Sequence, residues 1–237
     1  MARASAPATP LPQGEEKTAA VRSMFDTIAP RYEFMNRVLT FGLDRAWRNR
    51  AIRSLALPAG SVVLDLACGT GDLTRLATAA GYQVVGADLS LGMLEASTKP
   101  LVGTEADAAH LPFGDASMDG LLCGYALRNF TDLDASISEM ARVVRPGGRL
   151  SVLEVSAPSS KLLGLGHRMW FTKAVPLIGG LLSDRAAYQY LPRSTAYLPG
   201  PEELRRRFSA AGFSAVNITQ LSGGISQLIV ATRAGRT

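Results

Sequence analysis

The chain has few of the side chains that build metal centres and disulfide networks. Its 237 residues include two cysteines and two histidines. Cys68 and Cys123 lie in apolar contexts, so we expect reduced, buried thiols of a cytosolic protein and no disulfide. His110 and His167 are far apart, without a cluster of cysteines or carboxylates beside them, so we expect no metal. These few residues also offer no Ser-His-Asp or Cys-His arrangement for nucleophilic catalysis.

Long apolar runs are missing as well. No run approaches the roughly 18 apolar residues that a membrane span needs, although 47% of the residues are hydrophobic and can form a core. Residues 1–20 lack the apolar centre of a signal peptide, and we predict a disordered leader there. The net charge of +5 is mild. Ordinary solubility explains it, and contact with an anionic membrane surface is the alternative.

Strands and helices alternate through the middle of the chain, which predicts a doubly wound α/β sheet. Five strands are expected, at 61–66, 83–88, 101–105, 119–125 and 149–155. Helices are expected between them, at 73–80, 93–97 and 133–144. After a helix at 202–211, strands at 213–221 and 224–232 form a terminal pair.

Two regions flank or interrupt this alternation. Residues 21–57 carry apolar side chains at helical spacing and predict a helical cap. Residues 159–200 are apolar with several glycines and predict a lid over the active site. We therefore expect a single domain over 21–237. The aromatic residues of the lid form a substrate pocket or pack its own core; they are Trp170, Phe171, Tyr188, Tyr190 and Tyr197.

The most informative stretch is a glycine-rich turn between two predicted strands. Residues 62–72 read Val-Val-Leu-Asp-Leu-Ala-Cys-Gly-Thr-Gly-Asp, and the next strand ends at Asp88. This is half of a nucleotide-binding unit. Asp65 and Asp72 bracket the turn and would repel a pyrophosphate, but they suit a positively charged ligand. S-adenosylmethionine carries an ammonium and a sulfonium and has no phosphate. The alternative is a chance glycine-rich turn.

Ligands of open α/β sheets bind at the carboxyl ends of the strands, so the candidate donor site follows those ends. Asp88 suits ribose hydroxyls. Asp107 suits an adenine amine, with apolar residues 111–113 beside the ring, although a solvated loop carboxylate is the alternative. The residues expected to hold the donor are Asp65, Gly69, Thr70, Gly71, Asp88, Leu89, Met93, Asp107, Ala108 and Gly124.

The predicted fourth strand is followed by Arg128 and Asn129, which we expect to face the cleft beside a methyl acceptor. For Arg128 the alternative is a structural ion pair, which the sequence by itself favours. Glu154 ends the fifth strand and supplies either a site carboxylate or a supporting hydrogen bond. The run 205–207 of three arginines is a solvated helix face or a contact with an anionic surface.

Several of these motifs together resemble the ubiquinone/menaquinone biosynthesis C-methyltransferases. The similar segments are 32–36 (Tyr-Glu-Phe-Met-Asn), 41–47, 65–72, 107–113, 127–132 (Leu-Arg-Asn-Phe-Thr-Asp) and 188–191. That family is a branch of the class I S-adenosylmethionine-dependent methyltransferases. The resemblance implies a Rossmann-like fold: a mostly parallel seven-stranded sheet, helices on both faces and an antiparallel C-terminal strand.

The resemblance also implies methylation of a ring carbon of a reduced polyprenyl quinone, such as demethylmenaquinol. S-adenosylmethionine is the implied cofactor. Arg128 would favour the anionic form of a quinol hydroxyl, and Asn129 would orient that hydroxyl or a water. The residues expected to contact the acceptor are Tyr32, Tyr125, Tyr188 and Tyr190.

The implied partner is a small lipophilic quinol. We expect a cytoplasmic protein that touches the inner face of the membrane without spanning it, and no nucleic-acid partner. The sequence leaves the oligomeric state open, a homodimer included.

Two other functions stay open at this stage. A methyltransferase of a soluble specialised metabolite, acting at carbon, oxygen or nitrogen, is kept open by two departures from the family. Tyr125-Ala126 stands where Phe-Gly is common, and Ile229 stands where a histidine is frequent. The second alternative is a non-catalytic partner protein that binds S-adenosylmethionine. The intact donor turn and the Arg128-Asn129 pair argue against it.

Overall fold

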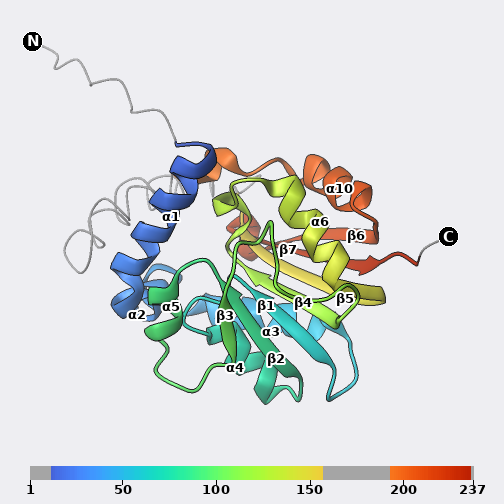
Figure 1. Cartoon of the computed structure of the whole chain (residues 1–237), viewed down its shortest axis with the longest axis horizontal. Helices are drawn as coiled ribbons and strands as arrows, with labels where there is room; N and C mark the ends of the chain where they lie inside the picture. Colours follow the sequence, from blue (N-terminus) through green and yellow to red (C-terminus); the bar gives the residue numbers. More distant parts are fainter. Residues whose placement is uncertain (1–11, 157–192, 236–237) are drawn as a thin grey trace, which may run out of the picture.

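The computed structural model describes residues 12–156 and 193–235 (Figure 1). Seven strands form one sheet in the order β3-β2-β1-β4-β5-β7-β6. All neighbours from β3 to β5 are parallel, and β7 runs antiparallel to both β5 and β6. This confirms the predicted mostly parallel sheet with an antiparallel C-terminal strand. The strands are β1 (Val62–Leu66), β2 (Gln83–Asp88), β3 (Gly103–Glu105), β4 (Met118–Gly124), β5 (Val144–Val155), β6 (Phe213–Leu221) and β7 (Ser226–Arg233).

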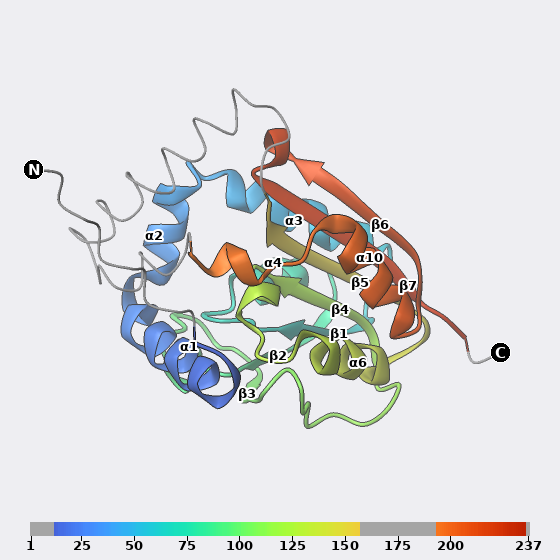
Figure 2. The same ribbon diagram turned by 90° about the horizontal axis from the view of Figure 1, so that it is seen from above.

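Helices cover both faces of the sheet, as predicted. In both views α1 lies on the side of the molecule away from α10 and the C-terminus (Figures 1 and 2). The helices are α1 (Gly14–Ile28), α2 (Tyr32–Leu39), α3 (Leu43–Leu55), α4 (Asp72–Ala79), α5 (Leu91–Glu95), α6 (Leu133–Val143) and α10 (Pro201–Ala210). The short 3-10 turns are η1 (Ala29–Arg31), η2 (Leu127–Asn129), η4 (Thr195–Tyr197) and η5 (Ser222–Gly224).

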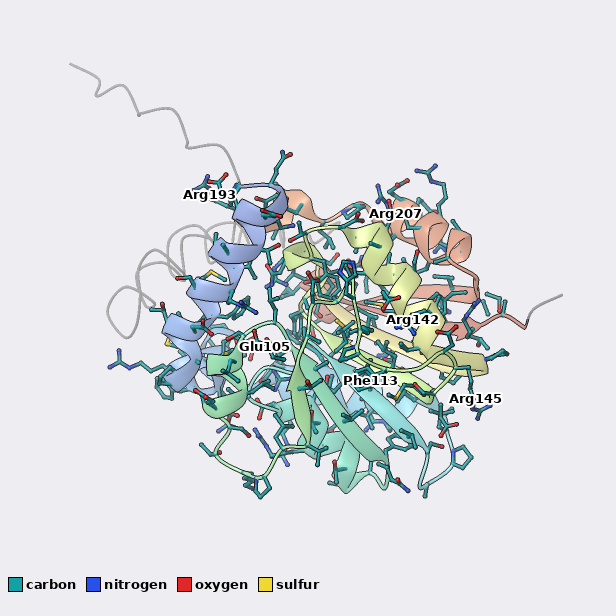
Figure 3. All side chains as sticks on the ribbon, viewed as in Figure 1. Glu105, Phe113, Arg142, Arg145, Arg193 and Arg207 are labelled. Atoms are coloured by element: carbon teal, nitrogen blue, oxygen red, sulfur yellow. The ribbon has the colours of Figure 1, made fainter. Side chains whose placement is uncertain are left out.

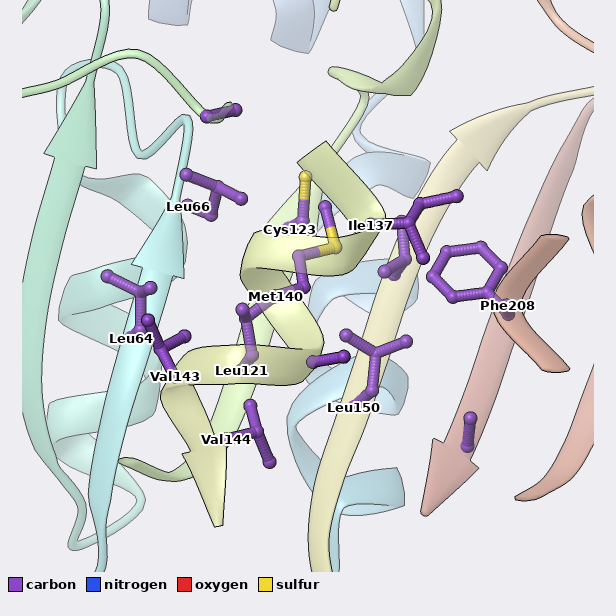
Figure 4. Close-up of a cluster of buried hydrophobic side chains, with 14 of the residues drawn as sticks. Leu64, Leu66, Leu121, Cys123, Ile137, Met140, Val143, Val144, Leu150 and Phe208 are labelled. Atoms are coloured by element: carbon purple, nitrogen blue, oxygen red, sulfur yellow. The ribbon is translucent and has the colours of Figure 1, made fainter. Parts of the chain in front are cut away.

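Strand β1 shows why the sheet is buried on both sides. Successive side chains of a strand point to opposite faces. Leu64 and Leu66 belong to one buried apolar cluster with Ile137 and Met140 of α6 and Phe208 of α10 (Figure 4). A strand between two helical layers must be apolar in both directions, which explains why four of the five residues of β1 are apolar.

The other face of the sheet packs on the helical cap and on α4. Val63 and Leu122 contact a cluster that includes Ile52 and Leu55 of α3 and Leu73 of α4. The cap helix α3 is therefore part of the core of the domain. This packing also fixes α4, and hence the glycine-rich turn that precedes it.

The predicted leader at 1–20 is too long. Helix α1 begins at Gly14, with Glu15 and Glu16 in its first turn, where carboxylates stabilise a helix N-terminus. Lys17 is buried, so this part of the chain packs on the domain. The lid predicted at 159–200 lies mostly outside the described residues. No helix of the two described stretches has the length and apolar character to cross a membrane.

Several strand ends differ from the prediction, those of β3 and β5 among them. β3 begins at Gly103 and not at 101, and has three residues. β5 begins at Val144, because the pairing with β4 passes an irregularity: Met118 pairs with Val144 and Gly120 with Arg149. A Cβ on Gly148 inside this irregularity would lie 2.7 Å from the carbonyl of Asp119, so the position requires glycine.

Candidate methyl-donor site

A cavity lies where the chain order of the sheet reverses, between β1 and β4, at the carboxyl ends of the strands. The space between its lining residues is about 710 Å³, including the part open to solvent. The segments after β1, β2, β3 and β4 line it, as the sequence predicted. Of the predicted donor residues it collects Gly69, Asp88, Leu89, Met93, Asp107, Ala108 and Gly124.

The turn after β1 brings Gly69 against the flexible end of the Met93 side chain. This residue has a φ of 56°, a left-handed conformation that favours glycine. A Cβ there would lie 2.8 Å from the Cε of Met93. The backbone of the turn therefore closes directly on the cavity, and a ligand can approach the main chain of Gly69.

Asp88 at the end of β2 is fixed by backbone donors. Its Oδ2 accepts the N–H of Gly69 at 2.7 Å and its Oδ1 accepts the N–H of Ser90 at 2.9 Å. Burial raises the pKa of this carboxyl above its ordinary value, although these N–H groups oppose the shift. Each carboxylate oxygen keeps a further acceptor position, which suits the two hydroxyls of a ribose.

Asp107 follows β3 and also lines the cavity. Its Oδ1 accepts the N–H of Ala109 at 2.9 Å. Arg142 of α6 holds the rest of this loop, since its guanidinium donates to the carbonyls of Leu111 and Phe113 at 3.0 and 2.8 Å (Figure 3). The loop that carries Asp107 is therefore anchored on the domain core.

Asp65 is buried away from the cavity lining. Its Oδ2 accepts the hydroxyl of Thr74 at 2.6 Å, and its Oδ1 has no hydrogen-bond partner among the described residues. Burial raises the pKa of Asp65 to about 7. A positive group placed beside this carboxyl would favour its ionised form.

Asp72 does not present a carboxylate to the ligand, and the interpretation of the turn as bracketed by two ligand-facing carboxylates is wrong here. Arg48 and Arg75 each donate to Asp72 at 2.5 Å. Burial raises the pKa of Asp72, but the two guanidinium groups outweigh it and the pKa lies below its ordinary value. The sequence did not predict the pairing of Asp72 with Arg48, because Arg48 lies on the cap helix α3, far from Asp72 along the chain.

Thr70 and Gly71, both predicted to contact the donor, lie outside the cavity lining. The hydroxyl of Thr70 donates to Glu33 of α2 at 2.8 Å, and Arg75 donates to the same carboxylate at 2.6 Å. Gly71 has a φ of 87° and directly precedes α4. These residues shape the turn and tie it to the cap.

Helix α1 closes one side of the cavity, a role that the sequence interpretation missed. Thr18, Val21, Arg22 and Phe25 all line it. The spacing of Val21 and Phe25 predicts a helix. The polar residues of α1 do not indicate which part of the domain this helix packs against.

The start and the middle of α1 hold different strand-end loops. Near its start, Lys17 donates to the carbonyl of Phe130 at 2.6 Å and lies 3.9 Å from the ring centre of Tyr197. Burial lowers the pKa of Lys17 to about 8. One helical turn further along, Arg22 donates to the carbonyl of Leu89 at 3.0 Å and pairs with Glu105 at the end of β3. Helix α1 thus spans the cavity.

Several residues that were predicted to act on the methyl acceptor line the cavity. Tyr32, Tyr125 and Asn129 line the cavity. Tyr125 has a φ of 62°, and its hydroxyl lies 3.1 Å from that of Ser226. Burial raises the pKa of this phenol. Two further predicted acceptor contacts, Tyr188 and Tyr190, lie outside the described residues.

Arg128 is engaged in a buried ion pair and is absent from the cavity lining. Its Nη1 donates to Glu154 at 2.5 Å and to the carbonyl of Tyr125 at 2.6 Å, and its Nε donates to Ser194 at 3.2 Å. The side chains of Arg128 and Glu154 are 7% and 0% exposed. This geometry favours the structural ion pair over direct contact with an acceptor.

Ile229 is fully buried in β7 within the apolar cluster that includes Leu150 and Phe208. It does not line the cavity. The departure from histidine at this position therefore does not remove an ionisable group from the cavity wall.

Cys68 and Cys123 are both free and buried, as predicted. Burial raises the pKa of both thiols, which keeps them protonated. Within the described part of the chain, no three His, Cys, Asp or Glu side chains are grouped so that they could hold a metal ion.

Solved structures with this fold include proteins of different activities. A phosphoethanolamine N-methyltransferase of Haemonchus contortus, solved with S-adenosyl-L-methionine, is 16% identical, with a TM-score of 0.64 over 91% of this chain and 60% of that one. The [4+2]-cyclase SpnF is 17% identical, with a TM-score of 0.67 over 95% of this chain and 97% of that one. At such identities the likeness concerns the fold.

Similarity in sequence is closer to curated quinone-pathway proteins. A ubiquinone/menaquinone biosynthesis C-methyltransferase UbiE of Syntrophotalea carbinolica is 42% identical over 87% of this chain and 91% of that protein. A demethylmenaquinone methyltransferase of Thermus thermophilus is 42% identical over 89% of this chain and 100% of that protein. Residues 13–233 match a single family throughout. The chain belongs to the ubiE/COQ5 methyltransferase family.

Proposed function

We propose that this chain binds S-adenosylmethionine in the cavity under α1 and methylates a ring carbon of a reduced polyprenyl quinone. Demethylmenaquinol, or its equivalent in a ubiquinol pathway, is the acceptor that the curated relatives suggest. The observation that carries the proposal is the placement of Asp88 and Asp107 at neighbouring strand ends, in one cavity with the main chain of Gly69.

The residues present fit this donor. Asp88 would accept the ribose hydroxyls while Gly69 and Ser90 hold its carboxylate in place. Asp107 would accept the adenine amine. Asp65 adds a buried oxygen without a partner among the described residues, next to the turn, which suits a ligand of positive charge. When bound, S-adenosylmethionine supplies an activated, electrophilic methyl group.

Apolar side chains would hold the adenine ring. Leu89, Met93 and Ala108 line the cavity beside the two carboxylates. Their packing excludes water from the ring faces, and the carboxylates set its orientation.

The acceptor side of the same cavity is formed by Tyr32, Tyr125 and Asn129. Because the donor is already reactive, catalysis mainly requires that the protein align the acceptor carbon with the methyl group. Asn129 would orient a quinol hydroxyl through its side-chain amide. The two tyrosines would pack against the ring.

The buried ion pair with Glu154 changes the role that we propose for Arg128, from contact with the acceptor to positioning of its neighbours. Its contacts with Glu154 and with the carbonyl of Tyr125 fix the turn η2 on which Asn129 lies. We assign it to positioning Asn129 and Tyr125. Loss of Arg128 would then displace two cavity residues and leave a buried carboxylate without its partner.

The chain would act as a cytoplasmic protein at the inner face of the membrane, where its lipophilic acceptor resides.

Turnover on a panel of acceptors tests the proposal. Purified protein and S-adenosylmethionine are incubated with demethylmenaquinol kept reduced, and separately with soluble phenols, and products are analysed by mass spectrometry. Methylated menaquinol is the expected product, and Asn129→Ala should slow its formation without abolishing donor binding. Methylation of a soluble phenol with the quinol untouched would overturn the acceptor assignment. Donor binding without turnover on any acceptor would favour a non-catalytic binding protein.

A further inference from the structure

Three large apolar side chains are exposed within the ten residues 34–43 of the cap. Phe34 on α2 is 59% exposed, Phe41 in the following turn is 73% exposed, and Leu43 at the start of α3 is 42% exposed. Arg37 and Arg45 are exposed between and beside them. We call this surface, made of Phe34, Arg37, Phe41, Leu43 and Arg45, the α2 face.

The folding of α2 explains why these side chains point outward. Met35 on the same helix is 1% exposed and takes the core-facing position. Phe34 and Arg37 are three residues apart and share one side of the helix. Phe41 has a φ of 53° and is followed by Gly42 with a φ of 74°. A bulky residue is rarely left-handed, so this turn presents an aromatic ring to solvent at some conformational cost.

The charge of the α2 face is positive. Arg37 and Arg45 make no ion pair with any described residue. The acidic side chains of the same segment are engaged elsewhere: Glu33 pairs with Arg75 at 2.6 Å, and Asp44 is buried within 3.6 Å of Arg48. Exposed aromatic and aliphatic side chains flanked by uncompensated arginines are the pattern of a surface that binds anionic bilayers.

We propose that the α2 face docks on an anionic phospholipid bilayer. Phe34, Phe41 and Leu43 enter the lipid interface, and Arg37 and Arg45 bind lipid phosphates. Tyr32, on the same helix, lines the cavity. Docking therefore brings the acceptor side of the cavity to the membrane in which a polyprenyl quinol is dissolved. This consequence rests on the proposed function, whereas bilayer binding is measurable without it.

Vesicle co-sedimentation of the full chain tests the proposal. Vesicles of phosphatidylglycerol with phosphatidylcholine are compared with vesicles of phosphatidylcholine alone. The first variant is Phe34→Ser with Phe41→Asn and Leu43→Ser, since asparagine tolerates the left-handed backbone at 41. The matched control is Leu91→Ser with Val102→Ser, two apolar side chains that are 50% and 72% exposed elsewhere. Thermal unfolding of each variant shows whether it is folded.

The wild type should bind the anionic vesicles and not the neutral ones. The triple variant should bind at least roughly tenfold more weakly, and the control should bind like the wild type. Arg37→Gln with Arg45→Gln should weaken binding about 25-fold, from roughly fivefold per arginine. Wild-type affinity in both α2-face variants, or equal loss in the control, would overturn the proposal. So would a change of oligomeric state with unchanged vesicle binding, which would make the α2 face an interface between copies.

Turnover separates this inference from the proposed function. With a short-tailed, water-soluble quinol the triple variant should react like the wild type. With a long-tailed quinol in anionic vesicles it should lose activity in step with vesicle binding. If vesicles are bound but no quinol is methylated, the proposed function fails and the docking surface stands. If quinols are methylated and no vesicle is bound, the docking surface fails alone.

Discussion

Substitution of Arg128 by methionine distinguishes a positioning role from direct contact with the acceptor. The pair with Glu154 is buried on both sides, and its Nη1–Oε1 distance is 2.5 Å. Removing one partner of a buried pair costs about 3–5 kcal/mol, because the remaining charge stays desolvated. Glu154 would keep the N–H groups of Val155 at 2.7 Å and of residue 128 at 3.3 Å. We therefore expect a loss near the lower end, about 3 kcal/mol.

The assay is urea unfolding combined with turnover and donor titration. Arg128→Met should unfold at lower urea, while its affinity for S-adenosylhomocysteine should stay within about threefold, since Arg128 does not line the cavity. The double variant Arg128→Met with Glu154→Gln removes the stranded charge and should recover roughly half of the lost stability. Arg206→Met is the control: this side chain is 75% exposed in its pair with Glu203, and its loss should cost less than about 1 kcal/mol.

Turnover decides between the two roles. If Arg128 positions Asn129 and Tyr125, the double variant should regain part of the activity together with stability. Wild-type stability of Arg128→Met with abolished turnover would refute the structural role. A double variant that regains stability but no activity would show that the guanidinium acts on the acceptor itself.

Three further substitutions test the donor site and its electrostatics. Asp88→Asn removes the charge and keeps an acceptor for only one of the two backbone N–H groups that the carboxylate binds, and should weaken S-adenosylhomocysteine binding in calorimetry roughly 10- to 100-fold; unchanged affinity would exclude Asp88 from the site. Gly69→Ala and Gly60→Ala both place alanine at a positive φ, 56° and 83°, and should each lose about 1–2 kcal/mol of stability. Only Gly69→Ala, whose Cβ would meet Met93 at 2.8 Å, should also lose donor affinity, and equal donor binding by the two variants would contradict this. Burial raises the pKa of Asp65 to about 7 from 3.8, so the folded state favours the protonated form. The free energy of unfolding of the wild type should therefore fall relative to Asp65→Asn as pH rises between these values, and parallel urea curves would show that Asp65 titrates normally.

The local parts of the fold were predictable from the sequence because short-range patterns determine them. The glycine-rich turn after β1, the apolar run of β1 and the carboxylate that ends β2 follow from strand length and turn chemistry. The same reasoning predicted that Asp88 and Asp107 reach one cavity, because parallel strands end at one edge of the sheet.

The parts that the sequence did not reveal depend on contacts between distant segments. Asp72 was expected beside the ligand, but Arg48 from the cap neutralises it. The sequence by itself favoured an ion pair for Arg128 but did not identify its partner, which is Glu154 at the end of β5. The docking of α1 rests on contacts such as Arg22 with Leu89. No periodicity or spacing encodes such pairings.

The masses of the quinones in cells from which this chain has been deleted test the central claim most directly. The account predicts accumulation of a polyprenyl quinone that lacks one ring methyl group, and restoration of the methylated quinone by the wild-type chain but not by Asp88→Asn. Fully methylated quinone at unchanged abundance in the deleted cells would contradict the account.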